Sequence, residues 1–244
     1  MTLARRPMFA VAAVAVAVLL WFAWGWFRDS SLVKVRHVEI TGVSNSPDAD
    51  AIKRELKQAA LGMTSLDVDT RKLDHSVSGY PIVRAVSASG GFPSKIQIKV
   101  HEYAAVAALT APGGHSVPVA FDGTLLPRLV KDKLPAVAVS ALPQHDGFES
   151  TRVRTLVRVL AGAPAALRPQ LYRAYLAPGG QGILVAMRSG PTLELGTSAR
   201  LAAKWASATR VLAAPSSTGA GEIDVRLPER PAARGFASSL NPQP

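Results

Sequence analysis

The chain contains no cysteine, and aromatic residues make up only 6% of its 244 positions. Without cysteine it can hold no disulfide, thiolate zinc site, iron–sulfur cluster or cysteine nucleophile. Charged residues are scarce as well, at 18%, so the chain is not a disordered polyelectrolyte. Its length allows one or two folded domains. The net charge of +11 leaves a nucleic-acid partner as a function class to test.

The distribution of the basic residues argues against nucleic-acid binding. Residues 1–28 hold three of the 28 basic residues and no acidic one, so 25 basic residues face 17 acidic ones in the remainder. These charges are dispersed, with no basic run longer than two residues. A nucleic-acid surface gathers its charge on one element or interleaves it with aromatic residues. We therefore expect no nucleic-acid partner.

One long apolar run stands near the N-terminus. Residues 8–27 carry no charge, and a helix of that length spans about 30 Å, the thickness of the hydrocarbon core of a bilayer. Trp21, Trp24 and Trp26 gather at its end, where indoles favour the headgroup interface. A core helix would show a polar face, and a cleaved signal peptide a shorter apolar stretch. The run predicts a single transmembrane helix at 8–27 after a tail of residues 1–7. Arginines flank it on both sides, so their charge does not determine its orientation.

The next 70 or so residues show the periods of a small α+β unit. Ser46, Pro47 and Asp48 are typical of a helix start, and Gly62 of a helix end. Alternation is cleanest at 95–101, where isoleucine and valine alternate with lysine, glutamine and histidine. The predicted order is strand 33–40, helix 48–61, a short helix from Asp67 or Asp69, strand 83–87 and strand 95–101, a β-α-α-β-β arrangement.

The rest of the chain predicts a mixed, β-rich domain with two helices. Helical spacing appears at 148–163 and 201–212. Glycine- and proline-containing turns separate the short strand-like runs, which is typical of an antiparallel meander. Residues 228–244 carry four prolines and predict a flexible tail. The expected strands include 104–109, 117–121, 172–177, 182–187, 192–195 and, last, Glu222–Leu227.

No catalytic, cofactor or metal site is expected from the sequence. The five histidines are scattered without ligand spacing, and the paired glycines lack the Lys-Ser/Thr that follows a phosphate-binding loop. Asp67, Asp69 and Asp74 could be taken for a metal or acid–base set, but aspartates at a helix start are more often caps. An enzyme, such as an anchored wall hydrolase, is therefore disfavoured.

Several short motifs carry a family resemblance. Residues 38–42, Gly62, 66–67, 80–83 and above all 92–102 (FPSKIQIKVHE) are similar to a POTRA domain. A membrane anchor followed by one POTRA unit is the layout of the FtsQ/DivIB family of bacterial division proteins. The distal half resembles the same family through Leu-Glu-Leu-Gly at 193–196, Lys204 and Ile-Asp-Val-Arg at 223–226.

The resemblance implies a domain plan and a function. It divides the chain into a cytoplasmic tail (1–7), the anchor (8–27), a linker with the POTRA domain (28–102), an FtsQ-type β-domain (103–227) and the tail (228–244). The implied protein is a non-enzymatic scaffold of the division complex in the bacterial inner membrane, with its bulk outside the cytoplasm. A POTRA-containing membrane protein of protein transport or outer-membrane assembly is the alternative.

The resemblance also implies a binding site. In the family, the final strand region of the distal domain receives an FtsB-like partner alongside an FtsL-like protein, both single-pass division proteins. If this strand lies at a sheet edge, its backbone groups can accept a partner strand. Alternatively, it is an ordinary closing strand in which Asp224 and Arg226 stabilise the fold. The candidate partner-binding residues are Glu222, Ile223, Asp224, Val225, Arg226 and Leu227.

Overall fold

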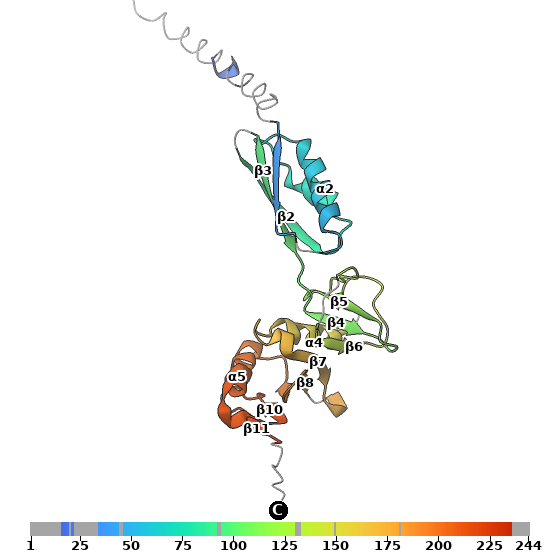
Figure 1. Cartoon of the computed structure of the whole chain (residues 1–244), viewed down its shortest axis with the longest axis vertical. Coiled ribbons are helices and arrows are strands. Elements are labelled where there is room, and N and C mark those ends of the chain that lie inside the picture. Colours follow the sequence, from blue (N-terminus) through green and yellow to red (C-terminus); the bar gives the residue numbers. More distant parts are fainter. Residues whose placement is uncertain are drawn as a thin grey trace, which may run out of the picture. The chain divides into compact units, whose positions relative to one another are not determined.

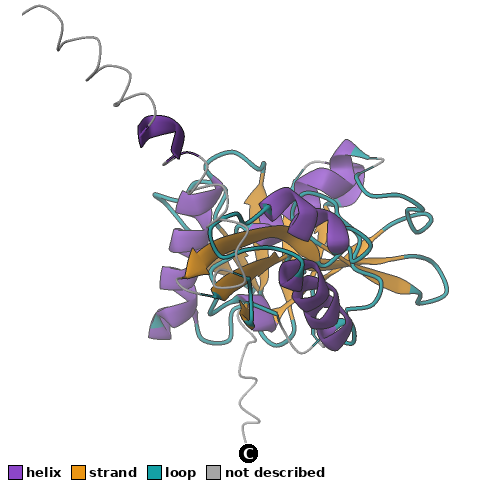
Figure 2. Cartoon of the chain, turned by 90° about the horizontal axis from the view of Figure 1, so that it is seen from above, coloured by secondary structure: helices purple, strands orange, loops and turns teal. Residues whose placement is uncertain are grey.

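A computed structural model describes residues 16–19, 21, 34–43, 46–91, 94–129, 133–148, 150–180 and 182–235. The chain divides into two compact units, one ending at Tyr103 and the other beginning at Ala104. Both units combine helices with strands (Figures 1 and 2), which confirms the predicted α+β class.

The predicted membrane helix lies outside the described residues, apart from 16–19 and 21. Among the residues that the structure describes, no helix has the length and apolar character needed to cross a membrane.

The first unit has the predicted β-α-α-β-β order. Its three-stranded sheet has the order β1-β3-β2, with β3 parallel to β1 and antiparallel to β2. Helix α2 lies along one face of this sheet (Figure 1). The elements are β1 (His37–Thr41), α2 (Ala49–Leu61), α3 (Thr70–Ser76), β2 (Val83–Gly91) and β3 (Lys95–Glu102).

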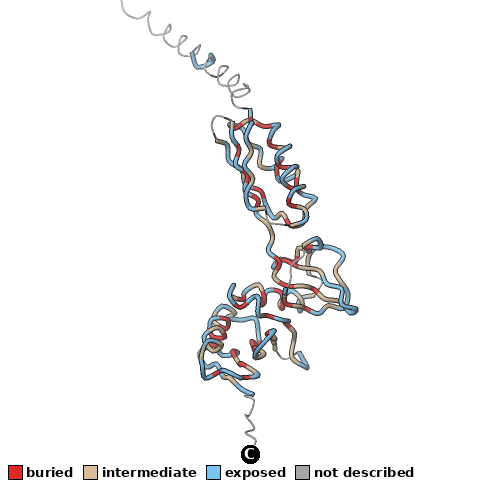
Figure 3. The backbone as a smooth tube through the Cα atoms, in the orientation of Figure 1, coloured by how far each residue is buried: buried red, intermediate tan, exposed pale blue. Residues whose placement is uncertain are grey.

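The hydrophobic periods of the sequence explain this packing. Along β3, Ile96, Ile98 and Val100 are buried and the residues between them are exposed. Figure 3 colours the backbone by burial and shows buried and exposed stretches in both units. Ile52 and Leu56 lie four residues apart on α2 and are fully buried. Each such side chain contributes about 1.5–3 kcal/mol by burial, so these contacts hold the helix on the sheet.

The three aspartates near α3 include two with structural roles. Asp69 caps the helix, since its Oδ1 accepts the backbone N–H groups of Arg71 and Lys72 at 3.0 and 3.2 Å. Asp74 Oδ1 accepts the backbone N–H of Val86 at 3.1 Å. That N–H lies on β2, an outer strand of the sheet, so Asp74 covers part of a strand edge.

The second unit is built on an eight-stranded sheet with the order β11-β10-β9-β8-β7-β6-β4-β5. Strands β4, β6 and β7 are parallel, and β7, β8 and β9 form the predicted antiparallel meander. The elements are β4 (Ala107–Thr110), β5 (Ser116–Val119), β6 (Ala136–Ala138), α4 (Thr151–Ala161), β7 (Leu171–Leu176), β8 (Ile183–Met187), β9 (Thr192–Gly196), α5 (Leu201–Ala213), β10 (Glu222–Asp224) and β11 (Ala232–Arg234), with short 3₁₀ turns at Arg168–Gln170, Pro178–Gly180 and Pro215–Ser217.

Both helices of this unit pack on one face of the sheet. Leu156 and Leu160 of α4 and Trp205 of α5 share one core with Val185 of β8 and Leu193 of β9. The alternate residues of these strands are only half-buried, and they face away from the helices. We call this helix-free side the open face of the distal sheet.

Candidate functional site

Residues 222–227, the predicted partner-binding strand, do not form a sheet edge. Glu222–Asp224 is β10, which pairs in parallel with β9 and antiparallel with β11. The condition for strand addition at 222–227, a position at the sheet edge, is therefore not met by β10, and β11 (Ala232–Arg234) ends the sheet instead. Strand β11 lies within 228–244, where the prolines predicted a flexible tail. That prediction is wrong for residues 232–234.

The ladder shows which backbone groups of β11 face outward. Thr192 N donates to Gly221 O and Val225 N donates to Glu194 O. The N–H of Glu222 and the C=O of Asp224 belong to the same two peptide groups and point the opposite way, toward β11. Glu222 and Asp224 therefore face β11, where their partners are Arg234 and Ala232. Alternation along β11 then directs the backbone N–H and C=O of Ala233 away from the sheet.

The opposite edge of the sheet is protected. Its outer strand, β5, carries Pro118, which has no N–H to offer a partner strand. The carbonyl of Pro118 already accepts the N–H of Leu126 at 2.9 Å. The two edges thus differ: β5 is closed by a proline and a loop, whereas β11 presents Ala233.

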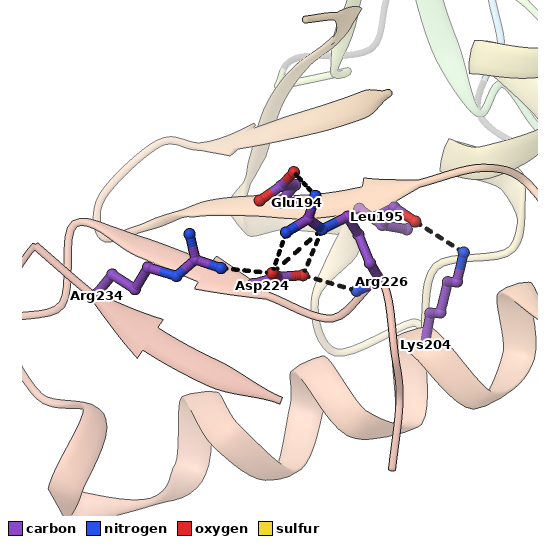
Figure 4. A network of polar contacts seen from close by, with 6 residues as sticks. All are labelled: Glu194, Leu195, Lys204, Asp224, Arg226 and Arg234. Atoms are coloured by element: carbon purple, nitrogen blue, oxygen red, sulfur yellow. Dashed lines mark hydrogen bonds and ion pairs between the residues drawn. The ribbon is translucent and has the colours of Figure 1, made fainter. Parts of the chain in front are cut away.

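A charged network lies beside β11 on the open face (Figure 4). Arg226 Nη2 lies 2.8 Å from Asp224 Oδ2, and Arg226 Nη1 lies 3.2 Å from Glu194 Oε1. Arg234 Nη2 lies 2.6 Å from the same Asp224 oxygen. The Asp224 side chain is only 13% exposed, whereas both arginine side chains are 51% exposed. A carboxylate beneath two exposed guanidinium groups thus ties β9, β10 and β11 together.

The network shifts the acidity of its two carboxyl groups in opposite directions. The hydrogen bond from Arg226 holds the pKa of Asp224 below its usual value and outweighs the opposing effect of burial. Burial raises the pKa of Glu194, and the nearby charge of Asp224 raises it further, although Arg226 opposes both. Asp224 is therefore the carboxylate whose ionised form the fold favours.

We expect the network to make stability depend on pH. Because the pKa of Asp224 is lowered, its contribution is fully present above the unfolded value of about 3.9 and is lost as the pH falls through the folded value. Asp224→Asn should lower the free energy of unfolding by about 1–3 kcal/mol at pH 7 and show a smaller further loss below pH 4 than the wild type. Denaturant unfolding of the full chain in detergent at pH 7 and pH 3 measures both.

Two features bear on this measurement. Glu194, with its raised pKa, contributes in the opposite direction, and because the charge of Asp224 helps to raise that pKa, the difference between variant and wild type reports Asp224 together with this coupling. Glu229→Gln is the control, because Glu229 pairs with Arg200 on the exposed surface, where an ion pair contributes about 0–1 kcal/mol. Equal acid sensitivity of Asp224→Asn and the wild type would contradict the assignment.

The predicted residues divide by exposure. Ile223 and Val225 are 1% and 0% exposed and belong to the core, so their side chains are not accessible to a partner. Glu222 is half-buried on the open face, and Leu227, after Arg226, is 63% exposed. The sequence did not predict the strand Ala232–Arg234. A three-residue strand with two alanines has no hydrophobic alternation to detect.

Lys204, part of the family-like pattern, is a buried structural residue. Its side-chain Nζ donates to Leu195 O and Thr197 O, both at 2.8 Å, and joins α5 to the end of β9 (Figure 4). Burial lowers the pKa of the ammonium group, and Arg200 adds to this effect. Across the described ranges, no group of three or more histidine or acidic side chains could hold a metal ion.

Comparison with known proteins supports the assignment of the first unit. Residues 33–103 match the family model described as "POTRA domain, FtsQ-type", so this unit is an FtsQ-type POTRA domain, as the sequence motifs predicted. Among solved structures, the chain is similar to the major extracytoplasmic domain of the trans isomer of the bacterial cell division protein DivIB from Geobacillus stearothermophilus. The identity is 17% and the TM-score 0.31, over 43% of this chain and 87% of that one. No curated protein matches the chain.

Proposed function

We propose that this chain is a non-enzymatic scaffold of the bacterial division complex. Residues 8–27 anchor it in the inner membrane with the N-terminus in the cytoplasm, and both folded units lie outside the cytoplasm at the septum. The observation that carries the proposal is the FtsQ-type POTRA domain at 33–103, which directly follows the predicted anchor. The scaffold would link early assembly to septal wall synthesis by holding its partners at the membrane.

The proposed binding step is strand addition to β11. The C-terminal segment of an FtsB-like partner pairs with the outward N–H and C=O of Ala233, and an FtsL-like protein joins the complex. Two further features support this edge: Leu227 is exposed in the loop that leads to β11, and Arg226 keeps half of its side chain in solvent. An acidic residue of the partner would bind Arg226 from the solvent side.

A proline substitution tests this step. Ala233→Pro removes the outward N–H without removing a ladder bond to β10, so the sheet should remain folded while capture of the FtsB-like segment weakens at least 10-fold. Ser116→Pro is the matched control, because Ser116 occupies an equivalent outward position on β5, two residues from Pro118. The full chain in detergent, titrated with the partner segment, gives both affinities.

The same variants, placed in cells depleted of the native copy, test the wider role. Ala233→Pro should yield filaments with unfinished septa, and Ser116→Pro should divide normally. Capture retained by Ala233→Pro would overturn the strand-addition step. Normal septation together with outer-membrane defects on depletion would overturn the division role in favour of protein transport or outer-membrane assembly.

A further inference from the structure

A second surface of the distal unit lies on the open face, away from β11. Tyr172, Arg173 and Tyr175 of β7 gather there with Arg188, which follows β8, and we call these four residues the Arg–Tyr cluster. The Arg173 guanidinium carbon lies 4.9 Å from the ring centroid of Tyr175 and 5.9 Å from that of Tyr172. Arg188 lies 6.0 Å from the Tyr172 ring. These distances are those of cation–π contacts.

A register shift in β7 creates the cluster. Leu171 pairs with Met187 but Arg173 pairs with Ala186, so an extra residue, Tyr172, stands in the strand. Leu171 and Ala174 remain in the core, whereas Tyr172 and Arg173 are both exposed in succession. Such bulges redirect side chains, and here one places an aromatic ring and a guanidinium group side by side on the surface.

The residues beside Arg173 leave it accessible. Its neighbours on the adjacent strands are Ala136 of β6 and Ala186 of β8. Methyl groups cannot cover a guanidinium group or form an ion pair with it. Arg173 therefore rises above the sheet between short side chains, and two tyrosine rings hold its orientation.

The charge of the cluster is not neutralised within the described part of the chain. No carboxylate there pairs with Arg173 or Arg188, and Arg188 donates instead to the carbonyls of Pro169 and Leu134 at 3.2 and 3.3 Å. The other end of the same face differs, because Asp224 and Glu194 neutralise the arginines beside β11. A cation–π contact orients a guanidinium group but leaves its charge and its in-plane N–H donors free.

We propose that the Arg–Tyr cluster is a docking site for an acidic segment of a protein partner. A Glu or Asp carboxylate accepts two parallel hydrogen bonds from Arg173, and the neighbouring residues of the segment cover the ring of Tyr172, a residue that is 48% exposed. Tyrosine and arginine are the residues that dominate the energetics of protein interfaces. The site is separate from the proposed strand addition, because four strand spacings of about 4.8 Å each separate β7 from β11.

An acidic peptide serves as the probe. An acetylated, amidated ten-residue peptide of alternating Glu and Ala is titrated into the full chain in detergent. Arg173→Gln should weaken binding about 10-fold or more, and Arg154→Gln less than 2-fold. Both substitutions remove one exposed positive charge, but Arg154 lies on helix α4, on the opposite side of the sheet. Arg173→Lys should resemble Arg173→Gln, because lysine keeps the charge but loses the planar fork.

Each outcome bears on the proposal. Equal weakening by Arg173→Gln and Arg154→Gln would show attraction to net charge alone and overturn the site. Full binding by Arg173→Lys would overturn the bidentate arrangement. Preference for anionic lipid vesicles or single-stranded DNA over the peptide, lost in Arg173→Gln, would replace the protein segment as the occupant. Ala233→Pro should leave peptide binding intact, which separates a failure here from a failure of strand addition.

Discussion

Trp205→Ala is expected to lower the free energy of unfolding of the distal unit by about 3–5 kcal/mol, the usual cost of truncating a buried tryptophan. Trp205 is 1% exposed and is among the largest fully buried side chains in the described residues. Its Nε1 donates to Val159 O at 3.1 Å, so one side chain joins α5 to α4 above the sheet. Alanine would leave a cavity between both helices and an unpaired carbonyl beneath it.

The expected loss is large relative to the stability of the unit. A domain of this size is stabilised by about 5–15 kcal/mol, so the change would remove roughly a fifth of the stability at the high end of this range and most of it at the low end. Trp205→Phe is an intermediate change, because it loses the N–H and the smaller part of the ring volume, and it should cost about half as much. Urea unfolding of the full chain in detergent, followed by circular dichroism, measures both variants.

The consequence should reach β11, the proposed partner-binding edge. Val225 and Ile223 flank that edge and share the core with Trp205, so a loosened core should lower partner capture as well as stability. The first unit has its own core and should unfold as in the wild type. A loss below 1 kcal/mol for Trp205→Ala would contradict the assignment of Trp205 as the link between the helices.

The sequence predicts an element well where its pattern of apolar and polar residues repeats over enough positions to be recognised. The alternation of Ile96, Ile98 and Val100 runs through a central strand with one buried face, and α2 places Ile52 and Leu56 on one side. Asp69 was expected as a cap and is one. These features set the β-α-α-β-β order of the first unit, and the same reasoning found both helices and the meander of the second.

Where prediction fails, the deciding contacts are tertiary. Strand β11 has three residues and exists because β10 offers it a ladder, which no local pattern in 232–234 reveals. The bulge that exposes Tyr172 depends on the register between β7 and β8. Arg226 was expected to face a partner, yet it also holds Asp224 and Glu194, which lie 2 and 32 positions away in the chain. The sequence thus located the C-terminal end of the sheet but not its outer strand, which is β11.

The first unit provides the second large expected effect, at Gly90. A Cβ added there would lie 1.7 Å from the carbonyl oxygen of Ser65, far inside any real contact. The Ser65 oxygen belongs to the main chain and the backbone of Gly90 fixes the position of the Cβ, so no side chain can rotate aside, and either β2 or the loop that contains Ser65 must move. Overpacking of this kind costs about 1–3 kcal/mol and more when backbone must shift, and we expect Gly90→Ala to reach at least 3 kcal/mol.

Gly79→Ala is the matched control for Gly90→Ala. Gly79 follows α3 in the same unit, and a Cβ added there meets no atom within 4 Å. Because alanine restricts the unfolded chain more than glycine does, this variant should be unchanged or more stable by up to about 1 kcal/mol. The two variants make the same chemical change, so the difference between their urea midpoints measures the close approach of Ser65 to β2. Equal midpoints would show that the loop yields without cost. A large difference would show that the Ser65 loop packs against β2 with no room for a Cβ at Gly90.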